Sequence, residues 1–297
     1  MRWRAARRAR PDTAARRAPG LEDSGPRKRR RWLTGPAAAA ALVAALTVGV
    51  VAGLTPAAGA AGDMAVSFGR AMRQLVSSSQ TAKPFSGAAA VGALFTVSAG
   101  QLGSHFCTGS VVSSPHGDLV ITAAHCVSKT TASIAFVPGY DDGATPYGVW
   151  TVTKVYVDQA WTSSANPDDD FAFLQVSQPG SITPIEDVTG AETLATNQPA
   201  RQLVDVIGYP DSASAPIACR NWTTEPMTGQ LQFDCGGYTD GTSGGPFLAD
   251  VDPTTGQGTL IGVIGGYEQG GLLPQVSYSA LFGSNVESLY AEAVAGS

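Results

Sequence analysis

Short runs of β-prone residues, separated by clusters of glycine, proline, aspartate and serine, make up the chain from about residue 88 onward. This alternation is typical of antiparallel strands joined by turns. Six runs precede a segment rich in proline and threonine and six follow it: 90–97, 106–112, 119–122, 133–137, 149–157 and 171–176, then 203–207, 217–223, 230–234, 246–248, 259–264 and 275–278. The pattern predicts an all-β domain over 88–297, built from two packed six-stranded antiparallel β-barrels. Barrel 1 covers about 88–177 and barrel 2 about 201–278, and the loss of turn residues over 280–295 predicts a C-terminal helix.

Charge is divided unevenly along the 297 residues. Of the 19 lysines and arginines, 12 lie in the first 31 positions, so the rest of the chain carries 7 basic and 21 acidic residues. A body with this acidic excess lacks the basic surface that nucleic acids require. No nucleic-acid partner is therefore expected.

The first 60 residues have the three parts of a secretory signal. A basic segment leads into an uncharged, alanine-rich stretch, 36–54, which is followed by the small residues Ala58-Gly59-Ala60. Paired arginines before Trp32-Leu33 also resemble a twin-arginine signal, so we expect secretion by a twin-arginine or Sec-type route, with no membrane association after cleavage. The alternative is an uncleaved anchor, because about 19 apolar residues can just span a bilayer. Residues 61–87 are predicted to be a pro-segment or an N-terminal extension.

Four cysteines, Cys107, Cys126, Cys219 and Cys235, remain after export. None belongs to a C-x-x-C pair, so neither a metal nor a redox site is expected. An even number in an exported chain indicates two disulfides, for which three connectivities are open. Pairing Cys107 with Cys126 and Cys219 with Cys235 places one bridge in each half and is the connectivity that we predict.

Three polar residues stand in contexts that suit nucleophilic catalysis. His125 follows a β-prone run and directly precedes Cys126, whose bridge would hold its loop, as a general base requires. Ser243 lies in the glycine-dense turn 240–246, where successive N–H groups can point at one oxyanion. Asp170 precedes an apolar run and can be buried beside an imidazole.

Each of these residues also has a simpler interpretation. Most histidines are surface or core residues, as we take His105 and His116 to be, and glycine-rich turns are common in β proteins. Asp168 and Asp169 are most simply solvated loop acids, or else a weak calcium contact. Taken together, the residues favour catalysis over these simpler interpretations, because a serine nucleophile needs a base and His125 can be that base.

Three motifs occur in a fixed order: T-A-A-H-C at 122–126, D-F-A-F-L-x-V at 170–176 and G-x-S-G-G-P at 241–246. Together with F-C-T-G-S at 106–110 they resemble the chymotrypsin-type (trypsin-like) serine peptidases, over about residues 88–290. The sequence V-I-G-Y-P further resembles the secreted bacterial branch that includes glutamyl endopeptidases.

The resemblance implies a His125–Asp170–Ser243 triad between two barrels and an oxyanion hole made by the N–H groups of Gly241 and Ser243. It implies a secreted serine endopeptidase that hydrolyses protein or peptide substrates through an acyl-enzyme, without a cofactor. The alternative from another class is a catalytically silent, peptidase-like binding protein at the cell surface.

The sequence also departs from the family pattern. Animal trypsins carry an aspartate before the serine, which pairs with a freed N-terminal amine, whereas this chain has Thr242. Gly237 stands where trypsins place a pocket-floor aspartate; if residues 236–240 align with a gap instead, Asp234 or Asp240 reaches the pocket. Gly265 and Gly266 match the strand that pairs with substrate, although relatives often have serine at the position of Gly265. Since the second half also lacks the histidine of glutamate-specific relatives, the side chain preferred before the cleaved bond is not predicted.

Overall fold

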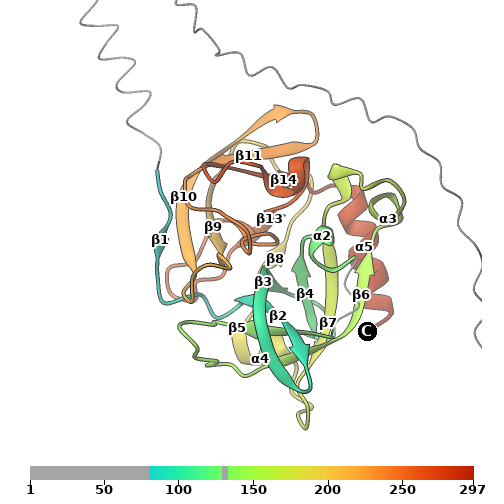
Figure 1. The fold of residues 1–297 in the computed structure, drawn as a ribbon. Helices are drawn as coiled ribbons and strands as arrows, with labels where there is room; N and C mark the ends of the chain where they lie inside the picture. The colour runs from blue at the N-terminus through green and yellow to red at the C-terminus, as the bar shows by residue number, and fades with distance from the viewer. Residues whose placement is uncertain (1–79, 129–132) are drawn as a thin grey trace, which may run out of the picture. The chain divides into compact units, whose positions relative to one another are not determined.

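The computed structural model describes residues 80–128 and 133–297. In its first half, six antiparallel strands form a closed barrel in the order β2-β3-β4-β7-β6-β5 (Figure 1). The strands are β2 (Val91–Ser98), β3 (Gln101–Val112), β4 (Leu119–Thr122), β5 (Ser133–Pro138), β6 (Trp150–Val157) and β7 (Ala172–Ser177). Each of the six runs predicted in this half is a strand, so barrel 1 is confirmed.

The second half is an eight-stranded sheet. Its order is β14-β11-β10-β9-β12-β13-β8, and β1 pairs with the free edge of β10. Six of these strands match the predicted runs, and the short strands β1 and β8 were not predicted. The bounds are β1 (Lys83–Pro84), β8 (Thr193–Leu194), β9 (Leu203–Gly208), β10 (Ile217–Met227), β11 (Gln230–Asp234), β12 (Pro246–Ala249), β13 (Thr259–Val263) and β14 (Val276–Ala280).

The predicted closure of the second barrel is not found among the described strands, because β13 and β14 do not pair as strands. A hydrogen bond from the N–H of Gly265 to the carbonyl of Tyr278 (2.9 Å) joins the two just beyond the end of β13. The next N–H, that of Gly266, donates to Asp170 in the other half instead of to a strand of this sheet. The opening in the second sheet therefore lies at the candidate site.

Helices are short apart from α5 (Ser284–Ala295), which confirms the predicted C-terminal helix. α5 buries Val286, Leu289 and Ala293, a spacing that places them on one face, and it packs against β6 and β7. The other helices within 80–128 and 133–297 are α2 (Ala124–Val127), α3 (Gln159–Ser164), α4 (Ile185–Thr189) and the 3-10 turns η1 (Pro167–Asp169) and η2 (Tyr267–Gly270).

One hydrophobic cluster runs through both halves. It contains Ile121 and Phe173 of the first barrel, Ile207 and Val263 of the second sheet, and the buried face of α5. Each half also has a hydrophobic cluster of its own in its interior. Because the shared cluster excludes water between the halves, we expect them to unfold as one cooperative unit.

Residues 80–87, the end of the predicted pro-segment or extension, lie against the second sheet. β1 pairs with the start of β10, and the N–H of Gly236 donates to the carbonyl of Gln80 (2.7 Å). The export signal at 1–60 and the rest of the extension fall outside the described residues and stay predictions. Along the described part of the chain, no helix combines the length and apolar character that a membrane crossing requires.

A buried carboxyl group lies where the two halves meet. Glu192 is fully buried, and its backbone N–H donates to Val111 of β3 (2.9 Å). Its Oε2 accepts the N–H of Gly258 beside β13 (2.6 Å), whereas its Oε1 has no partner among the described residues. Burial raises the pKa of Glu192 from 4.5 to about 7, although the bond from Gly258 partly opposes this shift.

Glu192 predicts a stability that depends on pH. Because the folded protein holds this proton up to about pH 7 while the unfolded chain releases it near 4.5, the free energy of unfolding should fall as the pH rises between these values. The loss is on the order of 3 kcal/mol. Urea unfolding of Glu192→Gln, which cannot ionise, should lack this slope, whereas Glu225→Gln at an exposed position should keep it. Parallel profiles for wild type and Glu192→Gln would contradict the assignment.

Candidate active site

His125 lies in α2, a single helical turn that directly follows β4. The disulfide between Cys107 of β3 and Cys126 joins this turn to the barrel, and a second disulfide links Cys219 to Cys235. Both predicted pairs are confirmed. The potential ligand atoms of Cys107, His125 and Cys126 lie within 4.8 Å of one another, as in a metal site, but disulfide sulfurs are not the thiolates that a metal binds.

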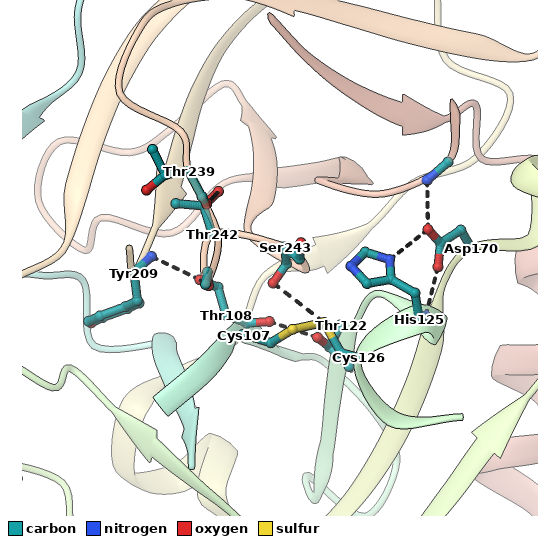
Figure 2. The surroundings of a disulfide bond; sticks show 12 residues. Cys107, Thr108, Thr122, His125, Cys126, Asp170, Tyr209, Thr239, Thr242 and Ser243 are labelled. Carbon is teal, nitrogen blue, oxygen red and sulfur yellow. Dashed lines mark hydrogen bonds and ion pairs between the residues drawn. A yellow bond between two sulfur atoms is a disulfide. The ribbon is translucent and has the colours of Figure 1, made fainter. Parts of the chain in front are cut away.

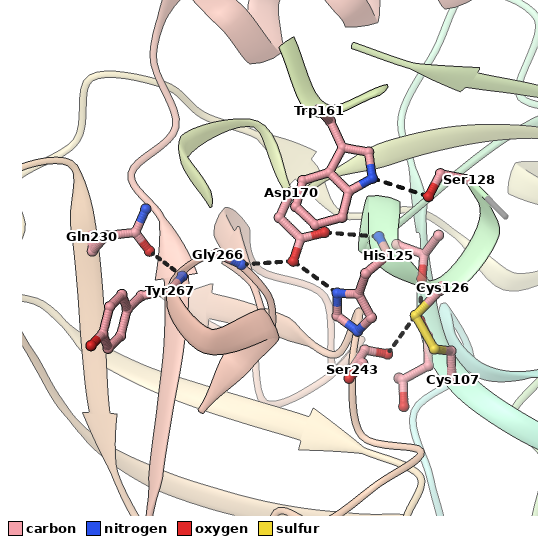
Figure 3. Close-up of polar contacts among 12 residues, drawn as sticks. Cys107, His125, Cys126, Ser128, Trp161, Asp170, Gln230, Ser243, Gly266 and Tyr267 are labelled. Carbon is pink, nitrogen blue, oxygen red and sulfur yellow. Dashed lines mark hydrogen bonds and ion pairs between the residues drawn. A yellow bond between two sulfur atoms is a disulfide. The ribbon is translucent and has the colours of Figure 1, made fainter. Parts of the chain in front are cut away.

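Asp170 is 1% exposed and directly follows η1. Its Oδ1 accepts the backbone N–H of His125 (2.9 Å), and its Oδ2 lies 2.8 Å from Nδ1 of the same residue. Oδ2 also accepts the N–H of Gly266 (3.0 Å), which comes from the second half (Figure 3). An ionised carboxylate only accepts hydrogen bonds, so it places the imidazole proton on Nδ1 and leaves Nε2 as a base.

Gly265 lets the second half come this close to Asp170. A Cβ atom at Gly265 would lie 2.8 Å from the carbonyl oxygen of Asp170 and 3.2 Å from its Oδ2. With no side chain in the way, the backbone of Gly266 supplies the donor itself. The carboxylate is therefore oriented by backbone groups from both halves.

The loop before Asp170 is tied to the C-terminal helix. Asn285, in the first turn of α5, donates from Nδ2 to the carbonyl of Asp168 (2.7 Å) and to Oδ1 of Asp169 (2.9 Å). Asp168 is exposed and also accepts from Nε2 of Gln230 (2.6 Å). Asp169 is only 6% exposed, so the expectation of a solvated loop acid was wrong for this residue. Its two carboxylate oxygens accept from Asn285 and from Asn166 (2.5 Å), which compensate for its burial.

Ser243 lies in the turn between β11 and β12. In this turn Gly241 has a φ of +91°, and a Cβ atom there would lie 2.4 Å from the backbone nitrogen of Asp211, so the position requires glycine. Among the hydrogen bonds of the described residues, none has the N–H of Gly241 or Ser243 as its donor. Both groups are therefore free to bind a ligand.

The histidine ring lies between the other two residues of the predicted triad. One ring nitrogen contacts Asp170 and the other faces Ser243 (Figures 2 and 3). No hydrogen bond between Ser243 and His125 is present in the described structure, and in free enzymes this bond is often long until substrate binds. His125 and Ser243 line the same cavity, together with Gly241. The three residues that the motifs selected thus meet at one place.

A second cavity of about 270 Å³ opens beside Ser243. Its walls are Tyr238, Thr239, Asp240, Thr242, Ile264, Gln269, Gly270, Gly271, Leu272, Leu273, Pro274 and Ser277. Gly237, Gly265 and Gly266 are not among them. Gly237 faces Ala82, and the other two lie against Asp170, so their predicted role in substrate binding stays a prediction.

Sequence reasoning missed the contacts of Trp161, a neighbour of the triad, and of His105, a buried residue outside it. Trp161, in α3, packs beside His125 with ring centroids 6.5 Å apart, and its Nε1–H donates to Ser128 (3.0 Å). Nothing in the sequence around Trp161 links it to the histidine. His105, expected to be an ordinary loop or strand residue, lies buried in β3, with Nε2 2.8 Å from the carbonyl of Pro210.

The two disulfides should differ in their effect on activity. Replacing Cys107 and Cys126 by alanine, or Cys219 and Cys235, should lower the free energy of unfolding by on the order of 3 kcal/mol in each case. Only the first pair should also lower kcat, by about ten- to a hundredfold, because it holds the turn that carries His125. Active-site-normalised kinetics below both melting temperatures test this, and equal losses of kcat would contradict it.

Comparison with known proteins agrees with this geometry. The trypsin family model matches residues 78–276. No curated protein matches the sequence. Among solved structures, the protease Anisep from Arthrobacter nicotinovorans is similar with a TM-score of 0.62 and 25% identity, over 72% of this chain and 100% of its own. The thermostable serine protease AL20 from an extremophilic microorganism is similar with a TM-score of 0.60 and 25% identity, over 71% of this chain and 99% of its own.

A Glu endopeptidase gives a TM-score of 0.57 over 73% of this chain and 98% of its own, and at 16% identity it shows a likeness of fold alone. The family assignment rests on the trypsin model, which covers more than half of the chain. The chain belongs to the trypsin family and is a serine-type endopeptidase.

Proposed function

We propose that the protein is a secreted serine endopeptidase in which Ser243, His125 and Asp170 act as a triad. The observation that carries the proposal is the 2.8 Å contact between Nδ1 of His125 and the buried Oδ2 of Asp170. This contact supports an imidazole whose Nε2 is unprotonated and turned toward the serine. A serine hydroxyl becomes a nucleophile when such a base takes its proton.

In the acylation step, Oγ of Ser243 attacks the carbonyl carbon of the peptide bond while Nε2 of His125 takes the hydroxyl proton. The tetrahedral intermediate then collapses, the C–N bond breaks, and the same proton passes to the leaving amine. A water molecule repeats these steps on the resulting ester and returns the proton to Oγ of Ser243. Asp170 stays ionised throughout and stabilises the imidazolium.

The oxyanion formed in both steps would be bound by the N–H groups of Gly241 and Ser243. Their lack of an acceptor within the described residues supports this role. Donors placed in this way are typically worth about 3 kcal/mol each in the transition state. The backbone of the turn around Ser243 would therefore supply electrostatic stabilisation without a cation.

Labelling by a fluorophosphonate probe tests the proposal. The probe should label wild type and not Ser243→Ala, and wild type should cleave a denatured protein substrate. A folded wild type that neither reacts nor hydrolyses would favour the alternative, a catalytically silent binding protein.

The cavity beside Ser243 supports discrimination against acidic side chains before the cleaved bond. Asp240 is its one charged wall residue, and the exposed Leu272 and Leu273 form an apolar rim. An acidic substrate side chain would meet the like charge of Asp240 and no cation. Substrates with such a side chain should therefore have a kcat/KM at least about tenfold below that of substrates with a neutral one. Profiling with a peptide library tests this, and Asp240→Asn should relax the discrimination. Preferred cleavage after glutamate would contradict it.

We also propose export with removal of residues 1–60. Two disulfides and a family that includes bacterial proteases support an extracellular site. Intact-mass analysis of secreted protein decides between a cleaved signal and a retained anchor.

A further inference from the structure

The turn that carries Ser243 is anchored to barrel 1 by a fully buried residue, Thr108 of β3. Its backbone N–H donates to the carbonyl of Ser243 (2.7 Å), and its Oγ1–H donates to the carbonyl of Gly241 (3.0 Å). The same hydroxyl oxygen accepts the N–H of Tyr209 (2.9 Å; Figure 2). Thr108 therefore contacts the turn on both sides of the residue that precedes the serine.

These contacts control the direction of the N–H groups in the turn. A peptide unit is planar and trans, so holding its carbonyl also sets the N–H on the opposite side. By holding the carbonyls of Gly241 and Ser243, Thr108 fixes the peptide units 241–242 and 243–244. The unit between them, 242–243, carries the N–H of Ser243, so its direction is set from both ends. The remaining donor, the N–H of Gly241, is set separately, because the carbonyl of Asp240 accepts from Asp211 (2.8 Å).

The rest of the turn is held without charge. Thr242, the residue before the serine, donates its Oγ1–H to the carbonyl of Thr239 (2.7 Å). The described residues contain two ion pairs, and neither involves this turn. Removing the hydroxyl of Thr108 would therefore leave two buried groups, the Gly241 carbonyl and the Tyr209 N–H, without the hydrogen bonds that it makes to them.

We infer that Thr108 is a positioning residue for the oxyanion hole, an inference that rests on the proposed function. It touches no reacting atom and acts through the peptide units that it holds. Because its hydroxyl bridges one donor and one acceptor within a buried site, a serine can replace it and a valine of similar volume cannot.

Kinetics of Thr108→Val and Thr108→Ser test the inference. The valine variant should lose about ten- to a hundredfold in kcat with KM nearly unchanged, and its affinity for a peptide boronate, which forms a tetrahedral adduct, should fall by the same factor as kcat/KM. The serine variant should stay within about threefold of wild type, since it keeps the hydroxyl.

Thr223→Val is the matched control. Thr223, in β10, is equally buried, and its hydroxyl also accepts a backbone N–H, from Gln202 (3.0 Å). It donates to the carbonyl of Ala200 (2.6 Å), with the carbonyl of Gln202 as a longer second acceptor (3.2 Å). This variant should lose stability and keep the kcat of wild type. Wild-type kcat in Thr108→Val, or equal losses in the two valine variants, would overturn the inference.

Hydrogen exchange separates this inference from the proposed function. Amides of the turn 238–245 should exchange faster in Thr108→Val than in wild type or Thr223→Val, whether or not the protein hydrolyses peptides. If wild type fails to react with a fluorophosphonate, the proposed function falls while exchange still tests the anchor. Unchanged exchange in Thr108→Val would overturn the role of Thr108.

Discussion

Ser243→Ala and His125→Ala should each lower kcat by roughly a millionfold, and the double variant should be no worse than either one. The reason is that the two residues serve a single proton transfer: without the base the serine is a weak nucleophile, and without the serine the base has no proton to take. The structure places one ring nitrogen of His125 on Asp170 and turns the other toward Ser243. Steady-state kinetics of the three variants measure the effect.

Residual activity above the uncatalysed rate should survive in all three variants, because the N–H groups of Gly241 and Ser243 do not depend on the side chains removed. His105→Ala is the control for a buried histidine outside the site, since His105 contacts Pro210 and no triad residue. Losses that multiply in the double variant would show that the two residues act in separate steps, which contradicts the triad.

Features set by neighbouring residues could be predicted from the sequence. The bounds of β4 and β11 agree with the predicted runs, because both strands begin directly after residues that favour turns, Asp118 and Gly229. His125, Asp170 and Ser243 could be selected because each lies within its own short motif, and the two disulfides could be predicted because four cysteines pair most simply with one bridge in each half.

Features set by contacts between distant residues could not be predicted. The N–H of Gly266 donates to Asp170 across 96 positions, and this contact, which lies where the second sheet is open, leaves no local pattern. Asp169 is adjacent to the exposed Asp168, yet it is buried and its carboxylate accepts from Asn285, 116 positions later, a contact with no local pattern. Thr108 lies within the predicted F-C-T-G-S motif, but its contact with Gly241 exists only when the two halves are packed together.

Asp170→Asn should lower kcat by roughly ten-thousandfold with the fold retained. An amide has one acceptor and one donor end, whereas the carboxylate accepts from three N–H groups: the backbone and Nδ1 of His125, and the backbone of Gly266. If the amide oxygen keeps the backbone N–H of His125, its NH₂ faces Nδ1 and the N–H of Gly266. The imidazole then accepts at Nδ1 and carries its proton on Nε2, so it cannot take the serine proton.

Asp169→Asn is the matched control, because Asp169 is the neighbouring buried carboxylate and contacts Asn285 rather than His125. It should reduce stability and leave kcat within about tenfold of wild type, since no tautomer depends on it. Nitrogen-15 NMR of the imidazole provides a readout that a structural role would not move: Nδ1 should be protonated in wild type and in Asp169→Asn, and Nε2 in Asp170→Asn. A kcat within about tenfold of wild type for Asp170→Asn would instead assign the orienting role to another carboxylate, and Asp168, exposed and bonded to Gln230, would then be the residue to replace.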